Sequence, residues 1–428
     1  MKIRAADVLL GTVTVGRLTR DGRGRTSFAF LPSYQRLPGR PVLGQHFEDD
    51  LEKRYKGKGD ELPPFFANLL PEGTLREVLE ARLGVDEGDD LSLLAAVGDD
   101  LPGAVVVRPS IEGAGDESSA LQSEDDEPPT SPHLAEQGFR FSLAGVQMKF
   151  SMMRRRDRLT LPGKNETGSW IVKLASSKWA GLCENEYSML EWARATGFEV
   201  PDCELVPASS IDGVPDEYLA GGPRAFAIRR YDRRPSGRVH QEDFAQVVGL
   251  PPERKYDHVS YAGIGRLARA LIGEDAFDEI LRRLVFAIAS GNNDAHLKNW
   301  SLVYPDGITA RLAPLYDQVS TVGWTAPNKE LALRIVWKRK FAEIDAAELR
   351  TMAERCGVQP DRAMAVVDET LEKLAQSWRR VLPKLPLLDE HRVALHRHWA
   401  SVPLLRKSRL HELAPSISYA RPRRPKRT

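Results

Sequence analysis

The stretch FAIASGNNDAHLKNWSLVY, residues 286–304, interrupts an apolar helical run with a dense polar loop and then turns apolar again. The loop places Asp294, His296, Lys298 and Asn299 within six residues. Polar side chains beside buried segments need partners, and a bound ligand is one way to supply them. Functional residues also concentrate on loops that a rigid scaffold positions. We therefore place the candidate site in this loop.

The bulk composition is that of an ordinary soluble globular protein. The 428 residues are 42% hydrophobic and 28% charged, and 61 basic residues balance 60 acidic ones. Bulk charge therefore favours neither nucleic acid nor a membrane surface as a partner. The cysteines, Cys183, Cys203 and Cys356, are too dispersed for a disulfide framework or a metal knuckle. We find no signal peptide and no membrane-spanning run, so the sequence predicts a cytoplasmic location.

The N-terminal part has strand and helix signals. VLLGTVTVGRL and RTSFAFL flank a turn-rich segment, which predicts a β-hairpin within residues 1–30. Residues 62–84 follow with a helix signal, in which Thr74 and Glu77 are placed as a capping box and Gly84 closes the helix. A second helix is expected at DDLSLLAAVGDD, residues 89–100.

The composition changes at residues 109–137, which are acidic and rich in Ser and Pro. This segment is expected to be a linker between domains, with an insertion within one fold as the alternative. The chain ends in the basic YARPRRPKRT, which is expected to be a solvated tail or, alternatively, a contact for nucleic acid or an acidic partner. The predicted division is an N-terminal subdomain at 1–108, a linker at 109–137, an N-lobe at 138–232, a helical C-lobe at 233–415 and a tail at 416–428.

Strand patterns dominate after the linker. Two runs surround the turn RRRD at residues 154–157, and SWIVKLA and RAFAIRRYDR are further strands. CENEYSMLEWARATG is expected to be a helix that Gly197 ends. From about residue 263 the pattern is helical, apart from a hairpin formed by WSLVYPDG and ITARLAPLYD. The fold class is therefore α+β.

Asp294 and Asn299 have the D-x-x-x-x-N spacing of kinase catalytic loops. In that chemistry the Asp accepts the proton of the attacking hydroxyl, and the Asn holds Mg²⁺ on the phosphates. A kinase also needs a second magnesium carboxylate, and LAPLYDQVST supplies Asp317 where a kinase has D-F-G. The spacing alone is weak evidence, but these residues follow one another in kinase order.

A strand lysine and a helix carboxylate complete the set. SWIVKLA supplies Lys173, and CENEYSML offers Glu184 and Glu186 as its ion-pair partner; we favour Glu186. The phosphate loop departs from the glycine-rich pattern, because FSLAGVQMKF has a single glycine. Small residues there still let backbone N–H groups approach phosphate. The candidate nucleotide-binding residues in this loop are Ser142, Leu143, Ala144, Gly145, Val146, Gln147 and Lys149.

The chain resembles the HipA-like serine/threonine kinases, the toxins of bacterial toxin–antitoxin pairs, over nearly its whole length. The matching stretches are PPFFANLLPEG, DLSLLAAVGDDLPGAV, FSLAGVQMKF, IVKL, ENEYSMLEWARATGFEVP, AIRRYDR, EDFAQVVGLPPERKYD, NNDAHLKNWSL and LAPLYDQVS. So many ordered matches make the resemblance specific. It implies an N-terminal β-rich subdomain followed by a two-lobed protein-kinase-like domain with a mainly helical C-lobe.

The resemblance also implies roles for residues. Asp294 is the expected catalytic base, and Asn299 and Asp317 are the expected Mg²⁺ ligands. Lys173 would contact the ATP phosphates, with Glu186 as its partner. His296 and Lys298 would line the catalytic loop. The backbone near Arg229 and Tyr231 would meet adenine, and Ser142 matches a serine that family members autophosphorylate.

The expected partners follow from the same resemblance. The substrate would be a protein of the translation machinery, such as an aminoacyl-tRNA synthetase. A small helix-turn-helix antitoxin (HipB-like) would restrain the kinase and, with it, bind operator DNA.

Two other functions fit parts of the sequence. D-A-H-L-K-N also matches the D-x-H-x-x-N of aminoglycoside and choline kinases, but those enzymes lack the module that contains PPFFANLLPEG. A non-catalytic co-repressor scaffold is the other alternative, against which the complete set of Lys173, Asp294, Asn299 and Asp317 argues.

Overall fold

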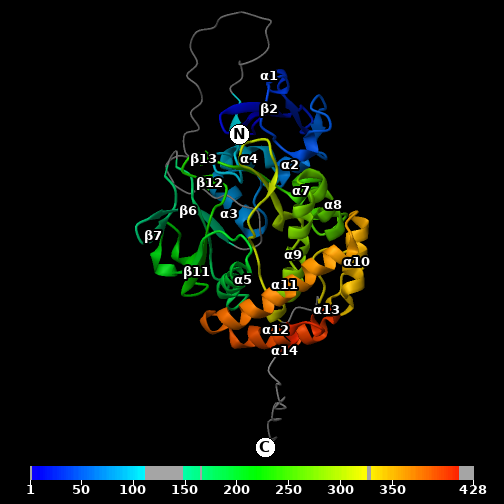
Figure 1. Ribbon diagram of the computed structural model, residues 1–428. Helices are drawn as coiled ribbons and strands as arrows, with labels where there is room; N and C mark the ends of the chain where they lie inside the picture. The colour runs from blue at the N-terminus through cyan, green and yellow to red at the C-terminus, as the bar shows by residue number, and fades with distance from the viewer. Residues whose placement is uncertain (1, 111–147, 164–165, 325–328, 414–428) are drawn as a thin grey trace, which may run out of the picture. The chain divides into compact units, whose positions relative to one another are not determined.

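The computed structural model describes residues 2–110, 148–163, 166–324 and 329–413 (Figure 1). The chain divides into two compact units. The first comprises Met1–Tyr187, Glu199–Val259 and His296–Asp317, and the second comprises Ser188–Phe198, Ser260–Ala295 and Gln318–Thr428. The expected α+β class is confirmed, because the first unit holds all the described sheets and the second is helical. The predicted domain boundaries stay a prediction.

The first unit begins with a five-stranded sheet in the order β4-β3-β2-β1-β5. Its strands are β1 (Ala5–Leu10), β2 (Val13–Arg20), β3 (Thr26–Phe30), β4 (Tyr55–Lys56) and β5 (Val105–Pro109). The predicted hairpin is confirmed as β2 and β3, which pair on either side of residues 21–25. VLLGTVTVGRL, however, contains parts of two strands, β1 and β2, where one was expected. Gly11 adopts φ +64 between them, a left-handed conformation that suits glycine in a tight turn.

Short helices accompany this sheet: α1 (Pro32–Gln35), η1 (Gln45–Phe47), α2 (Pro64–Ala67), α3 (Gly73–Leu83) and α4 (Asp90–Val97). The predicted capping box was wrong, because α3 starts at Gly73 and its N-cap residue is Glu72, whose side chain makes no capping hydrogen bond. Gly84 does close α3, with φ +61. At α4 the cap is Asp89, whose side chain accepts from the Ser92 N–H.

A six-stranded sheet follows, in the order β10-β7-β6-β8-β11-β9. Its strands are β6 (Lys149–Arg155), β7 (Arg158–Thr160), β8 (Trp170–Lys173), β9 (Cys203–Pro207), β10 (Ile211–Asp212) and β11 (Arg224–Arg229). The predicted strands around RRRD and in SWIVKLA and RAFAIRRYDR are confirmed. Helix α5 (Leu182–Thr196) follows β8 and ends before Gly197, at φ +99.

The rest of the first unit contains two small sheets, β12–β13 and β14–β15–β16. Their strands are β12 (Arg233–Arg234), β13 (Gly237–Arg238), β14 (His240–Asp243), β15 (Ser301–Tyr304) and β16 (Arg311–Leu312), and the accompanying helices are η2 (Ala208–Ser210), α6 (Asp216–Leu219), α7 (Phe244–Val247), η3 (Pro252–Arg254) and η4 (Leu297–Asn299). The predicted hairpin is confirmed as β15 and β16. β15 also pairs with β14, far away in sequence, which fixes the strand that follows the candidate loop.

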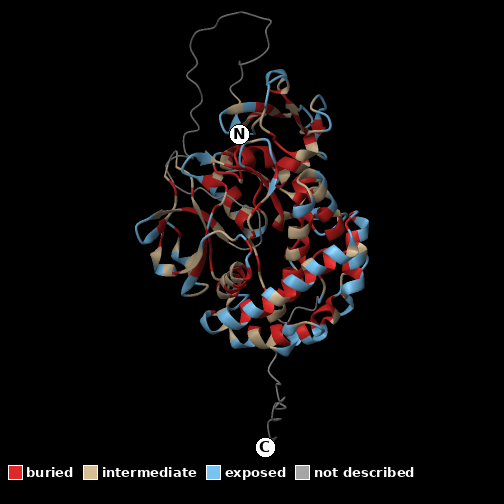
Figure 2. Cartoon of the chain, in the orientation of Figure 1, coloured by how far each residue is buried: buried red, intermediate tan, exposed pale blue. Residues whose placement is uncertain are grey.

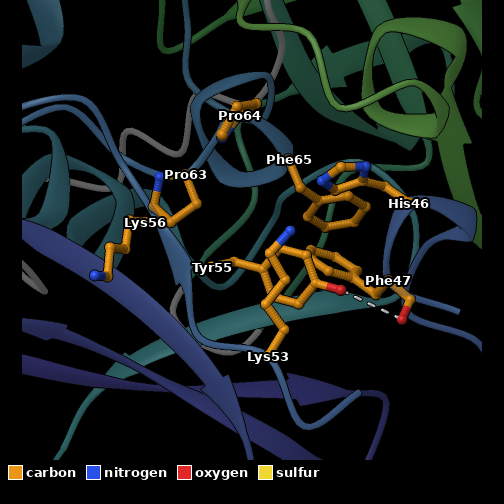
Figure 3. A pocket seen from close by; sticks show the side chains of 8 residues that line it. All are labelled: His46, Phe47, Lys53, Tyr55, Lys56, Pro63, Pro64 and Phe65. Carbon is orange, nitrogen blue, oxygen red and sulfur yellow. Dashed lines mark hydrogen bonds between the residues drawn. The ribbon is translucent and has the colours of Figure 1, made fainter. Parts of the chain in front are cut away.

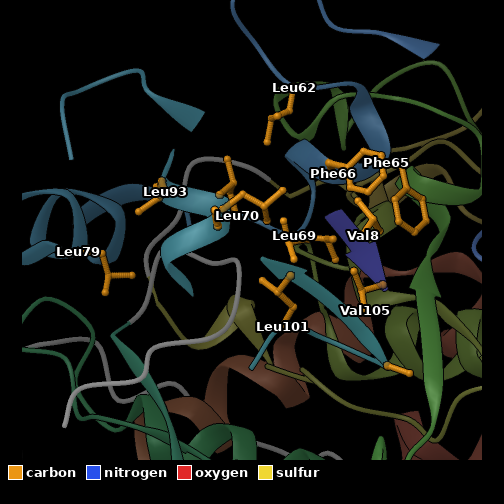
Figure 4. Close-up of a cluster of buried hydrophobic side chains, with 14 of the residues drawn as sticks. Val8, Leu62, Phe65, Phe66, Leu69, Leu70, Leu79, Leu93, Leu101 and Val105 are labelled. Carbon is orange, nitrogen blue, oxygen red and sulfur yellow. The ribbon is translucent and has the colours of Figure 1, made fainter. Parts of the chain in front are cut away.

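The two large sheets share one apolar core. The N-terminal part contributes residues such as Val8, Phe66 and Leu101 (Figure 4), and the six-stranded sheet contributes Phe150 and Val172. Burial of this size is the main favourable term in folding. The N-terminal subdomain therefore does not fold around a core of its own but is packed onto the sheet that carries Lys149 and Lys173.

The second unit contains α8 (Tyr261–Leu271), α9 (Glu274–Ser290), η5 (Thr321–Gly323), η6 (Phe341–Glu343), α10 (Ala346–Arg355), α11 (Pro360–Val381), η7 (Leu382–Lys384), α12 (Asp389–Ser401), α13 (Pro403–Arg406) and α14 (Arg409–Glu412). Buried and exposed positions recur at helical spacing along α11 (Figure 2). The core of the second unit contains Trp192, Trp378 and Trp399. The ring centroid of Trp378 lies 4.7 Å from that of Trp192 and 5.4 Å from that of Trp399. Among the described helices, none combines the length and apolarity needed to cross a bilayer.

A buried charge network also joins the N-terminal subdomain to the segment after β11. Arg230 donates to Asp100 at 2.9 Å and to Asp232 at 2.9 and 3.0 Å. Arg233 donates to the same two carboxylates at 2.8 and 2.9 Å. All four side chains are buried, so each charge depends on the others for compensation.

Arg230→Met should therefore destabilise the protein by about 3–5 kcal/mol, the usual cost of removing one partner from a buried ion pair. The matched control is Arg229→Met, because the neighbouring Arg229 is exposed and its ion pair with Asp202 is long, at 3.5 Å. Urea denaturation of both variants measures the difference. Equal midpoints would contradict the importance that we give to the network.

Candidate active site

The candidate site is built around Lys173, the last residue of β8. Its Nζ donates to Glu186 Oε1 at 2.7 Å and to Asp317 Oδ1. Glu186 lies on α5, one turn into the helix, and is 1% exposed. Burial alone would lower the pKa of the Lys173 ammonium, but Asp317 and Glu186 outweigh burial and raise it. Lys173 is therefore a fixed cation between two carboxylates.

The structure separates the two carboxylates that the sequence left open. Glu186 is the partner of Lys173, whereas Glu184 forms an ion pair with Arg224 at 2.9 Å. Glu184 and Glu186 are two residues apart, so they lie on different faces of α5.

Asp317 has an unusual backbone. Its φ of +55 is left-handed, a conformation that few residues other than glycine adopt. Burial alone would raise the pKa of its carboxyl, but Lys173 and Lys149 hold the pKa below its usual range. Asp317 is therefore an ionised carboxylate on a constrained turn, and such outliers are concentrated at functional sites.

Lys149 begins β6 and lies directly opposite Lys173 on β8. Two like charges at opposed positions of neighbouring strands repel each other. Burial, together with the cations Lys173 and Lys298, lowers the pKa of Lys149 to about 8, although Asp317 opposes this shift. Positive charge is therefore concentrated where the start of β6 lies next to the end of β8. Such an environment suits an anion.

Lys149→Met should stabilise the ligand-free protein, because it removes a cation whose charged form the fold disfavours. Between about pH 8 and the unperturbed pKa near 10.5, the unfolded chain keeps a proton that the folded chain has released, so wild-type stability from this group rises with pH. The stabilisation by Lys149→Met should therefore be larger at pH 7 than at pH 9.5. Urea denaturation at both pH values checks this, with the exposed Lys58→Met as control; equal effects at the two pH values would contradict it.

The second half of the candidate loop, from His296 onward, also belongs to the first unit. Asn299 ends η4, is buried, and its backbone N–H donates to His296 O at 2.9 Å. The His296 ring packs edge-on against Tyr256, with centroids 5.0 Å apart. Burial and the Lys255 charge lower the pKa of His296 to about 3, so its ring is neutral at pH 7.

Lys298 has specific partners. Its Nζ donates to Glu72 Oε1 at 2.7 Å and to the Asn68 carbonyl at 3.2 Å. Its own carbonyl accepts from the Tyr316 hydroxyl at 2.9 Å. We did not predict Glu72 as part of the site, and only its position in PPFFANLLPEG could have pointed to it.

Asp294 belongs to the second unit, at the exposed end of the turn that follows α9. Gly291 closes that helix with φ +62, and the Asp294 N–H donates to Asn292 Oδ1 at 2.9 Å. The Tyr261 hydroxyl donates to the next carbonyl, that of Ala295, at 2.9 Å. The backbone around Asp294 is thus held by its own unit, and the chain continues through His296 into the first unit.

The remaining predicted positions lie at the end of β11 or outside the described residues. The Arg229 N–H donates to Asp202 O at 2.8 Å. The Tyr231 ring lies against Tyr316, with centroids 5.7 Å apart. The predicted phosphate-loop residues outside the described part of the chain are Ser142, Leu143, Ala144, Gly145, Val146 and Gln147.

A separate pocket of the first unit contains none of the predicted site residues (Figure 3). Its lining is aromatic and basic: His46, Phe47, Lys53, Tyr55, Lys56, Pro63, Pro64 and Phe65. Phe47 and Phe65 also belong to the apolar core, so this hollow lies at the edge of that core.

The residues present fit ATP with Mg²⁺. Mg²⁺ prefers oxygen ligands and is usually held by one or two protein groups together with substrate phosphates. Asp317 and Asn299 offer a carboxylate and an amide oxygen, and Lys173 and Lys149 supply positive charge for phosphates. Among the described residues, no group of three or more His, Cys, Asp or Glu side chains is placed to hold a metal ion.

Comparison with known proteins identifies the family. The model of the HipA N-terminal domain matches residues 6–108, and that of the HipA-like C-terminal domain matches residues 141–378. "Putative kinase Y4dM" of Sinorhizobium fredii is 38% identical over 416 residues, which cover 95% of this chain and 99% of the relative. "Serine/threonine-protein kinase toxin HipA" of Shewanella oneidensis is 24% identical over 439 residues, covering 95% and 96% of the two chains.

A solved structure supports the same assignment at the level of fold. HipA of Shewanella oneidensis MR-1, in a complex with HipB and operator DNA, superposes with a TM-score of 0.72 at 22% identity, covering 96% of this chain and 99% of that one. The two family models match in the order N-terminal domain, then C-terminal domain, and the relative Y4dM is covered over nearly its whole length. Both findings agree with the resemblance inferred from the motifs. The chain belongs to the HipA-like family.

Proposed function

We propose that this protein is an ATP-dependent serine/threonine protein kinase. The observation that carries the proposal is the contact of the buried Lys173 with both Glu186 and Asp317. A strand lysine paired with a helix glutamate, next to a carboxylate in the position of the D-F-G aspartate, is the arrangement that active protein kinases require. Relatives that carry the name kinase support the same reaction class.

Each residue then has a role. Asp294 would accept the proton of the substrate hydroxyl, and Asn299 and Asp317 would be the protein ligands of Mg²⁺ when ATP is bound. Lys173 and Lys149 bind phosphate oxygens, and the backbone near Arg229 and Tyr231 receives adenine. Mg²⁺, when bound, neutralises charge on the transferred phosphoryl group.

We further propose that the kinase is a growth-arresting toxin of a toxin–antitoxin pair. The substrate would be a protein of the translation machinery, such as an aminoacyl-tRNA synthetase, and the kinase would act in the cytoplasm. A HipB-like helix-turn-helix antitoxin would restrain it and bind operator DNA with it. The support is family membership and the assembly in which the Shewanella relative was solved.

Ser142 is the proposed site of autophosphorylation. A phosphate adds about −1.5 to −2 charges and three acceptor oxygens. Lys149 follows Ser142 by seven residues in the sequence, and in the proposed mechanism the serine phosphate would compete with the phosphates of ATP for this cation. Phosphopeptide mapping after incubation with ATP and Mg²⁺ tests the assignment, which an unmodified Ser142 in an active enzyme would exclude.

The function is tested with purified protein, labelled ATP and Mg²⁺ in a lysate. Label on protein supports a protein kinase, and label on metabolites alone supports the small-molecule alternative. Absence of label from both the protein and the metabolite fractions would support the non-catalytic scaffold. A Lys173→Met variant controls for contaminating kinases, because it removes the cation that joins Glu186 to Asp317.

A further inference from the structure

The N-terminal subdomain reaches the catalytic loop through one short segment, residues 68–72. Lys298 Nζ donates to Glu72 Oε1 at 2.7 Å and to Asn68 O at 3.2 Å. Lys255 Nζ donates to the other oxygen of the same carboxylate, Glu72 Oε2, at 2.5 Å. Glu72 is therefore the common counterion of two lysines that lie 183 and 226 residues away in the sequence.

Both lysines are connected to η4, the turn that ends in Asn299. Lys298 is itself within η4, and the Lys255 carbonyl accepts from the Leu297 N–H at 3.2 Å. A displacement of either lysine thus shifts the backbone of the turn. Asp294 precedes Lys298 by four residues in the same loop.

The lysine side chains of this contact are largely shielded from water, whereas the Glu72 side chain is partly exposed. The side chain of Lys298 is 7% exposed and that of Lys255 is 11% exposed. Burial alone would raise the pKa of Glu72, but Lys298 and Lys255 lower it to about 2. The carboxylate is consequently ionised at neutral pH, and a neutral replacement would leave two neighbouring ammonium groups without it.

The segment that carries Glu72 is itself anchored. Asn68 is buried, and its Nδ2 donates to Leu250 O at 2.8 Å and to Pro64 O at 2.9 Å. Leu69 and Leu70 belong to the apolar core of the first unit (Figure 4). Glu72 is therefore presented from a fixed backbone and not from a loose surface loop.

We propose that Glu72 is a positioning residue for the kinase reaction: it holds Lys298 and Lys255, and through them η4 and Asn299, in the catalytic geometry. Lys298 then acts as a structural tie to the N-terminal subdomain and does not bind the transferred phosphate. This inference rests on the proposed kinase function. It gives the N-terminal subdomain a part in catalysis, because the catalytic loop is incomplete without its carboxylate.

The test is a double-mutant cycle on the full-length protein. The variants are Glu72→Gln, Lys298→Met and the double variant, with Glu77→Gln as control, because Glu77 is exposed on the following helix α3. Glu72→Gln should lower kcat by about 10–100-fold, the range expected when a catalytic group is misplaced by about 1 Å. If Glu72 acts through Lys298, the double variant should be no slower than Glu72→Gln by more than about threefold.

The split between kinetic parameters separates positioning from general instability. KM for ATP should change less than kcat, because Lys173 and Glu186 make no contact with Glu72 among their described contacts. Glu77→Gln should match the wild type. Wild-type kcat in a folded Glu72→Gln variant would overturn the inference, and so would a loss in Lys298→Met at least tenfold greater than that in Glu72→Gln, which would make Lys298 a catalytic residue.

Two outcomes remain distinct from these. If Glu72→Gln does not fold, Glu72→Asp replaces it: the shorter side chain keeps the charge, so the proposal expects a folded protein with a smaller loss of kcat, and an unchanged kcat would overturn it. An inactive wild type would refute the proposed function. An active wild type whose Glu72 variants are equally active would refute only the role of Glu72.

Discussion

Asp294→Asn should give a folded protein that transfers phosphate about 10²–10⁴-fold more slowly than the wild type, the usual cost of losing a general base. The amide has the shape of the carboxylate but cannot accept the proton of the attacking hydroxyl. The local backbone should persist, because its hydrogen bonds come from other groups. The Asp294 N–H donates to Asn292, and Tyr261 donates to the Ala295 carbonyl.

The measurement is single-turnover transfer to protein substrate, combined with ATP affinity and melting temperature. ATP affinity should stay within about threefold of the wild type, since the base binds the attacking hydroxyl and not the nucleotide. Asp275→Asn is the matched control, an exposed aspartate in the first turn of α9, the helix that leads into the same loop. Transfer by Asp294→Asn at the rate of this control would refute the assignment of the base.

Local patterns in the sequence predicted about half of the first unit's described strands and the helical nature of the second unit. They did not predict β4, β5, β9, β10, β12, β13 or β14. The alternation in SWIVKLA placed Lys173 on a strand, and the apolar spacing of residues 183–197 placed both glutamates on one helix. Such patterns could not decide whether Glu184 or Glu186 contacts Lys173. Both positions are polar in an amphipathic helix, and only the packing of α5 decides which one meets Lys173.

The errors have local causes. In VLLGTVTVGRL a two-residue turn at Gly11 is too short to interrupt an apolar run, so two strands were taken as one. At α3 the capping motif was present, but the chain begins the helix at Gly73, one residue before Thr74. In both cases a correct type of element was predicted with the wrong boundary.

The contacts that couple distant parts of the chain were beyond sequence reasoning. Glu72 and Lys298 are separated by 226 residues, and Arg230 and Asp100 by 130. A lone glutamate after a proline has no periodicity that marks it as a counterion. Such pairs are specified by the tertiary fold, which is why the resemblance to a family led to the proposed reaction class but not to Glu72.

Asp317→Ala should weaken Mg²⁺-dependent ATP binding at least about tenfold, which corresponds to about 1.4 kcal/mol. The substitution removes the anionic ligand proposed for the metal and also one of the two carboxylates that contact Lys173. Asp294→Asn should retain ATP affinity in the same titration, because it removes no nucleotide ligand. Calorimetry with ATP in the presence of Mg²⁺ and in the presence of a chelator measures the metal-dependent part.

The backbone at Asp317 requires a second variant. Alanine in a left-handed conformation costs about 1–2 kcal/mol, so Asp317→Ala could weaken binding by distorting the turn at φ +55. Asp317→Asn separates the two causes, because asparagine tolerates this conformation and keeps the shape of the side chain but lacks its charge. If the carboxylate is a metal ligand, Asn should lose most of the Mg²⁺-dependent affinity that Ala loses. If Asn binds Mg²⁺ and ATP like the wild type while Ala does not, Asp317 serves the turn and the metal is held elsewhere.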